Sequence, residues 1–132
     1  MIVVDASALV AIAAEEPDRH LYIAALEQSD AAHLAAPNYL ETGLLLVRRN
    51  IVANRREFDI WLKDAGVIVR ADLPLGTDAL DAYLRYGKDL HPARLNLADC
   101  FAYALAKTLD APLLYKGDDF AKTDIRSALQ PT

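Results

Sequence analysis

The sequence contains little cysteine, no long hydrophobic run and no excess of positive charge. Its single cysteine, Cys100, cannot form a disulfide within the chain, and no Cys/His pattern typical of a zinc site is present. No apolar stretch approaches the roughly 20 residues that a membrane-spanning helix requires. The first residues lack a basic segment followed by an apolar one, so we expect no signal peptide. These absences favour a soluble cytoplasmic protein with no membrane association.

The charge balance restricts how the chain could bind nucleic acid. The formal net charge is -5 at pH 7 and the sequence pI is about 5.0. Proteins that bind nucleic acid through general electrostatics are usually basic. Such binding would here require a local basic surface, bound cations or both, and a protein that does not bind nucleic acid is also consistent with this charge.

The length and composition fit one folded domain. The chain has 132 residues, of which 54% are hydrophobic and 25% charged, so it can bury a core and is not expected to be disordered. We find no repeat, low-complexity segment or linker, and therefore predict a single domain over residues 1–132.

Short apolar segments alternate with helical patterns along the chain. We predict strands at residues 2–4, 33–35, 67–69 and 113–115, and helices at residues 7–16, 18–28, 37–49, 56–65, 75–86 and 96–109. The helix at 37–49 has an apolar stripe at Leu40, Leu44 and Val47. This alternation predicts an α/β fold with a short parallel sheet flanked by helices on both faces. In such sheets, ligands bind beyond the carboxyl ends of the strands.

Several acidic residues fall at this expected edge of the sheet. Asp5 ends the first strand, and Asp118 and Asp119 follow the last one. Glu41 and Asp99 lie near the starts of two apolar helices. If the sheet is parallel, strand ends and helix starts share one edge, and all of these carboxylates could converge there.

Converging carboxylates have a chemical use. Like charges packed together repel one another and have raised pKa values unless a cation joins them. Mg²⁺ and Mn²⁺ prefer oxygen ligands, commonly a few carboxylates and waters. A cation held in this way can activate a water molecule and stabilise a phosphodiester transition state. It would also present positive charge to a phosphate at the surface of an acidic protein.

Each acid also has a purely structural explanation. Asp5 could cap the helix that follows it, and Asp99 could complete a capping arrangement with Asn96. Glu41 could be an exposed acid favoured by the helix dipole. Asp118 and Asp119 follow a Lys-Gly pair and could belong to an ordinary turn.

Four blocks of sequence resemble the PIN-domain family, in particular the VapC toxins of bacterial toxin–antitoxin pairs. They keep the order of the family's motifs and together span nearly the whole chain. The blocks are Met1 to Val10, Asn38 to Thr42, Tyr86 to Phe101, and Leu113 to Phe120 followed by Thr123-Asp124-Ile125.

The resemblance implies a Mg²⁺- or Mn²⁺-dependent endoribonuclease that a VapB antitoxin inhibits and that usually forms a homodimer. The family's first three acids correspond to Asp5, Glu41 and Asp99, and either Asp118 or Asp119 is the fourth.

We therefore predict hydrolysis of RNA phosphodiester bonds. Asp5 and Asp99 would hold the metal, with Asp118 or Asp119 as a further ligand. Glu41 would bind the metal or orient the attacking water, and the hydroxyl of Ser7 would position a carboxylate or a water. The candidate RNA-binding residues, which could equally form a solvated polar loop, are Arg85, Lys88, His91, Arg94, Lys116 and Lys122.

The predicted antitoxin requires a surface to bind. Apolar helices that carry Tyr22, Phe58 and Trp61 are expected to leave apolar surface that a small core does not cover. An antitoxin helix in a hydrophobic groove would be a familiar way to cover it.

Two other functions remain open at the level of sequence. A haloacid-dehalogenase-like phosphatase also begins with a strand followed by Asp, but it needs a second Asp two residues later, where this chain has Ser7. A receiver-like or purely interacting domain would use the acids only as helix caps. A nuclease assay with a series of divalent metals distinguishes the three functions.

Overall fold

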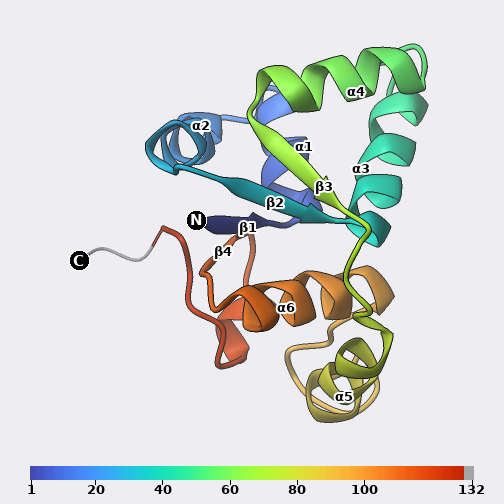
Figure 1. The fold of residues 1–132 in the computed structure, drawn as a ribbon, viewed down its shortest axis with the longest axis vertical. Coiled ribbons are helices and arrows are strands. Elements are labelled where there is room, and N and C mark those ends of the chain that lie inside the picture. The colour runs from blue at the N-terminus through green and yellow to red at the C-terminus, as the bar shows by residue number, and fades with distance from the viewer. Residues whose placement is uncertain (130–132) are drawn as a thin grey trace.

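The computed structural model describes residues 1–129, which are built around a parallel sheet (Figure 1). Four strands lie in the order β3-β2-β1-β4, and every pairing between them is parallel. The α/β fold class predicted from the sequence is confirmed. The strands are β1 (Ile2–Val4), β2 (Ala32–Ala35), β3 (Val67–Arg70) and β4 (Leu113–Leu114).

Helices cover both faces of the sheet. In Figure 1, α1 to α4 lie on one side of the strands, and α5 and α6 lie on the other. Within the described residues the helices are α1 (Ala6–Ala13), α2 (Arg19–Gln28), α3 (Ala36–Arg48), α4 (Arg55–Asp64), α5 (Gly76–Tyr86), α6 (Leu97–Leu109) and a 3₁₀ turn, η1 (Phe120–Lys122). None of them is long and apolar enough to cross a membrane.

The first strand contributes to two separate hydrophobic cores. Val3 packs into the core beneath α5 and α6, whereas Ile2 and Val4 pack into the core beneath α1 to α4. Side chains alternate between the faces of a strand, so a strand covered on both faces needs apolar residues at every position. This requirement explains the uninterrupted apolar run before Asp5.

The apolar stripe of α3 does not face the core. Leu40, Leu44 and Val47 are 60%, 51% and 41% exposed. The helix instead packs through Asn38, Thr42 and Leu46. Because β2 ends at residue 35 and α3 begins at residue 36, no linker allows the helix to rotate, and the backbone decides which side faces inward.

Of the three aromatic residues expected to leave apolar surface uncovered, only Trp61 is partly exposed. Tyr22 and Phe58 are only 4% and 2% exposed, so the prediction that they contribute to an uncovered surface is wrong. Both side chains are large enough to fill the core beneath α1 to α4, where they are buried. On α5, Leu80 and Leu84 point outward while Ala82 packs inward.

Candidate active site

Asp5 is placed at the edge of the sheet by the end of β1. Its backbone N–H donates to the carbonyl of Leu114 at 2.9 Å, which joins the ends of β1 and β4. The Asp5 side chain is 4% exposed and caps α1 by accepting from the N–H of Ser7 at 3.0 Å. Burial raises the pKa of the Asp5 carboxyl, although the hydrogen bonds from Ser7 oppose the rise.

Ser7 connects Asp5 to the chain beyond β4. Its hydroxyl donates to Asp5 Oδ2 at 2.6 Å and accepts from the backbone N–H of Lys116 at 2.9 Å. A single hydroxyl thus holds the first acid and fixes the start of the segment that carries Asp118 and Asp119.

Asn38, which was not among the residues singled out from the sequence, is the third contact of Asp5. Its side chain is fully buried, and its Nδ2 donates to the Ala98 carbonyl at 3.1 Å and to Asp5 Oδ1 at 3.5 Å. Asn38 therefore ties the first acid to the start of α6, next to Asp99. Its sequence signal was its place at the start of the Asn38 to Thr42 block, which resembles the PIN-domain family.

Asp99 lies in the first turn of α6 and does cap the helix. The Asn96 side chain accepts from the Asp99 N–H at 2.9 Å, and Asp99 Oδ2 accepts from the Asn96 N–H at 3.0 Å, which completes a capping box. One carboxylate oxygen of Asp99 is engaged in this way, and the other makes no hydrogen bond within the described residues.

The electrostatics show that the acids influence one another. Burial, followed by the charge of Asp5, raises the pKa of Glu41. Burial also raises the pKa of Asp99 to about 7, and the nearby charges of Asp5, Glu41 and Asp119 contribute to the rise. The charge of Asp5 thus acts on Glu41, and the charges of Asp5, Glu41 and Asp119 all act on Asp99.

Asp118 and Asp119 are the two candidates for the fourth acid. The charge of Asp119 is among the causes that raise the pKa of Asp99. Both side chains are exposed and follow Gly117, whose φ of +104° favours glycine at this turn. This effect on Asp99 favours Asp119 as the candidate for the fourth acid.

The acids do not form a ready-made cage for a metal ion. Among residues 1–129, no three His, Cys, Asp or Glu side chains are gathered closely enough to hold an ion together. The donor set nevertheless has the chemistry of a site for Mg²⁺ or Mn²⁺, because it consists of carboxylate oxygens whose mutual repulsion a divalent cation would relieve.

The basic residues proposed for RNA binding divide into two groups. Lys116 donates to Glu16 at 2.6 Å and Asp18 at 2.9 Å, so its ammonium group is already paired. Arg85 lies 3.8 Å from Asp124.

The remaining cations are not paired. Within residues 1–129, Lys88, Arg94 and Lys122 form no ion pair and are exposed. His91 accepts from the Ala93 N–H at 3.0 Å and shapes the loop that leads into α6.

Comparisons with known proteins identify the family. The PIN domain family matches residues 2–126. Ribonuclease VapC30 of Mycobacterium tuberculosis is 42% identical over 131 residues, which cover 98% of this chain and 100% of that protein. Ribonuclease VapC of Mycolicibacterium smegmatis is 43% identical over 125 residues, which cover 94% of this chain and 97% of that protein.

A solved structure agrees in fold. The crystal structure of M. tuberculosis VapC20, described as a Sarcin-Ricin loop cleaving toxin, superimposes with a TM-score of 0.72 at 18% identity. The match covers 95% of this chain and 96% of that one. The acidic edge of the sheet, the full-length relatives and the shared fold agree, and the chain belongs to the VapC ribonuclease toxins of the PIN-domain family.

Proposed function

We propose that this VapC-family ribonuclease cleaves RNA with Mg²⁺ or Mn²⁺ held by Asp5, Asp99 and Asp119. The observation that supports this most strongly is the contact of Asn38, whose Nδ2 donates to both Asp5 Oδ1 and the Ala98 carbonyl and so holds the first acid next to the start of α6, where Asp99 lies. The raised pKa of Asp99, to which burial and the charges of Asp5, Glu41 and Asp119 contribute, agrees with this placement. When bound, the cation would supply positive charge to the phosphate and favour ionisation of a water molecule.

The chain's own residues have distinct roles in this proposal. Asp5 is held in one orientation by Ser7 and Asn38, so it offers a fixed oxygen. Asp99 offers the oxygen that its capping box leaves free. Glu41, whose pKa is raised by burial and by the charge of Asp5, would orient the attacking water and accept its proton.

The RNA path is proposed to follow the unpaired cations. Lys88 and Arg94 lie in the loop before α6, the helix that begins with Asp99, and Lys122 lies just after Asp119. Lys88 and Arg94 therefore precede Asp99 in the chain, and Lys122 follows Asp119. From these positions the three cations could hold phosphates on either side of the cleaved bond. Lys116 would instead support the site through its pairs with Glu16 and Asp18.

The cognate VapB-type antitoxin is proposed to bind an apolar depression between α1, α2 and α4. This cavity of about 480 Å³ is lined by Ile12, Leu26 and Trp61 among others. An amphipathic antitoxin segment could place its apolar side chains there. We further propose that the toxin is a homodimer and acts in the cytoplasm.

A nuclease assay tests the proposed chemistry. The purified chain should cleave RNA with Mg²⁺ or Mn²⁺ and lose this activity in chelator. Asp5→Asn and Asp99→Asn should abolish cleavage while keeping the fold, and Asp119→Asn should reduce it more than Asp118→Asn.

The matched control is Asp110→Asn, which removes one exposed carboxylate at the opposite end of α6. It should cleave like the wild type. A folded Asp99→Asn variant with normal cleavage would remove Asp99 from the site, and cleavage undiminished in chelator would reject the metal.

A further inference from the structure

The segment that carries Asp119 is anchored before the acid and directly after it. The backbone N–H of Lys116 donates to Ser7 Oγ at 2.9 Å, which anchors the chain as it leaves β4. After the acid, Phe120 is 4% exposed and buries its ring in the core beneath α6. Residues 117–119 are exposed between these two points.

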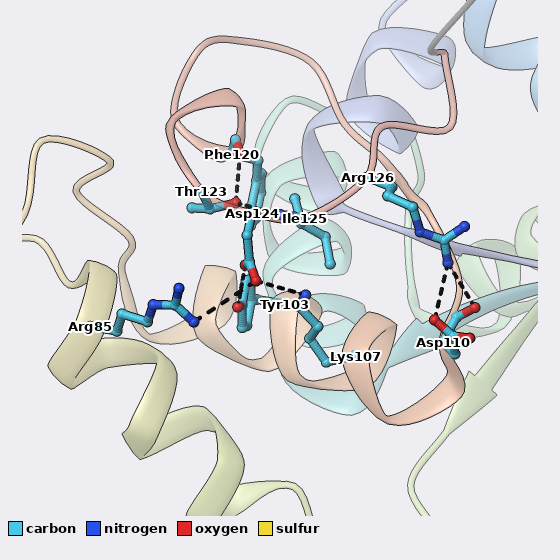
Figure 2. A network of polar contacts seen from close by, with 9 residues as sticks. All are labelled: Arg85, Tyr103, Lys107, Asp110, Phe120, Thr123, Asp124, Ile125 and Arg126. Atoms are coloured by element: carbon cyan, nitrogen blue, oxygen red, sulfur yellow. Dashed lines mark hydrogen bonds and ion pairs between the residues drawn. The ribbon is translucent and has the colours of Figure 1, made fainter. Parts of the chain in front are cut away.

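A further anchor of the same segment lies at Asp124. Figure 2 shows three side chains from two helices converging on this carboxylate. The Tyr103 hydroxyl donates to Oδ1 at 2.5 Å, Lys107 Nζ donates to Oδ2 at 2.9 Å, and the Arg85 guanidinium lies 3.8 Å from Oδ2. Burial acts to raise the pKa of Asp124, but the hydrogen bonds from Tyr103 and Lys107 hold it at about 2, so the carboxylate stays charged.

The turn between Phe120 and Asp124 is itself held together. Thr123 Oγ1 donates to the Phe120 carbonyl at 2.7 Å and accepts from the Ile125 N–H at 3.2 Å (Figure 2). A displacement of Asp124 would therefore be transmitted to the short 3₁₀ turn that begins directly after Asp119.

The position of this anchor on α6 relates it to the active site. Asp99, Tyr103 and Lys107 are spaced four residues apart, so they lie along one face of the helix. The same face thus begins with a catalytic acid and continues with the two donors that hold Asp124. The positions of Asp99 and Asp119 consequently both depend on α6.

We infer that Asp124 is a positioning residue that clamps the chain to Tyr103 and Lys107 and thereby sets Asp119 against Asp99. This role rests on the proposed function, in which those two acids share a divalent cation. A ligand that is already ordered loses little conformational freedom when the ion binds, so the clamp should strengthen metal binding without touching the metal.

The first test compares Asp124→Asn with Asp110→Asn by two measurements. Asp110 also makes an ion pair, with Arg126 at 3.3 Å, but its side chain is 99% exposed, so both variants lose one charge and only Asp124→Asn loses a partly buried set of contacts (Figure 2). In chelator, hydrogen exchange of amides 117–124 should accelerate only in Asp124→Asn. Titration of the protein with Mn²⁺, followed by electron paramagnetic resonance, should show about 10-fold weaker binding in Asp124→Asn and unchanged binding in Asp110→Asn. Tyr103→Phe, which removes only the hydroxyl, should act in the same direction.

A double-mutant cycle shows whether Asp124 acts through Asp119. In an Asp119→Asn background, Asp124→Asn should cause no further loss of Mn²⁺ affinity. Equal additional losses in both backgrounds, or unaltered exchange and affinity in Asp124→Asn, would overturn the positioning role. Wild-type protein that binds no Mn²⁺ would overturn the proposed function, and the exchange rates measured in chelator would still decide whether the clamp exists.

Discussion

At the scale of single residues, a structural role for an acid does not exclude the functional role that we propose for it. Asp5 caps α1 and Asp99 completes the capping box of α6, as the structural explanation predicted. Their charges nevertheless act on one another. A cap fixes a carboxylate at a helix start, and in a parallel sheet helix starts gather at the same edge as strand ends. Capping is thus one means by which the fold positions the acids.

Removing one of these charges should stabilise the metal-free protein. The pKa of Asp99 is about 7 in the folded chain and 3.8 without the fold, so the folded state holds the proton more tightly. Stability from this group is therefore complete below pH 3.8 and is lost as the pH rises through 7. In chelator, Asp99→Asn should melt several degrees above wild type at pH 8 and much closer to it at pH 5. Thermal melts at both pH values measure this, and a difference independent of pH would contradict the raised pKa.

At the scale of elements, the sequence predicted which segments are helices and strands better than it predicted which sides they bury. The strands at 2–4 and 67–69 and the helix ending at Leu109 were found close to the expected positions. The orientation of α3 was not predictable from its apolar stripe, because its direct junction with β2 sets its rotation. Asn38 and Thr42 can face inward because their polar side-chain donors bond to carbonyls.

The outward-facing leucines of α3 suggest a test of the proposed homodimer. Leu40 and Leu44 are more than half exposed and lie one turn apart on this helix. Leu44→Glu should leave the fold intact, since this side chain is not in the core, and should convert a dimer to a monomer by burying an unpaired charge. Light scattering after size-exclusion chromatography measures the mass, with Gln28→Glu, at the exposed end of α2, as the control that adds one negative charge away from α3. A wild-type monomer, or a dimer that persists in Leu44→Glu, would reject this interface.

At the scale of the whole molecule, the sequence indicated the candidate active site through the order of its motifs. Asp5 at a strand end and Asp99 at a helix start could be predicted because the topology of a parallel sheet brings such positions together. The link from Asn38 to Ala98 and the clamp at Asp124 join residues distant in sequence. Asn38 and Asp124 both lie in blocks that resemble the family's motifs, but no local pattern shows which distant residues they contact, so these contacts could not be predicted before the fold was known.

If Asp5, Glu41, Asp99 and Asp119 form one cation site, Mn²⁺ should raise the melting temperature of chelator-treated protein at constant ionic strength. A cation that binds only the folded state at about 100 times its dissociation constant contributes about 2.7 kcal/mol. For a domain of this size we predict a rise of about 10 °C. The rise should be much smaller in Asp5→Asn and should persist in Asp110→Asn. Equal melting temperatures of the wild type with and without saturating Mn²⁺ would contradict a shared site and leave the acids as helix caps alone.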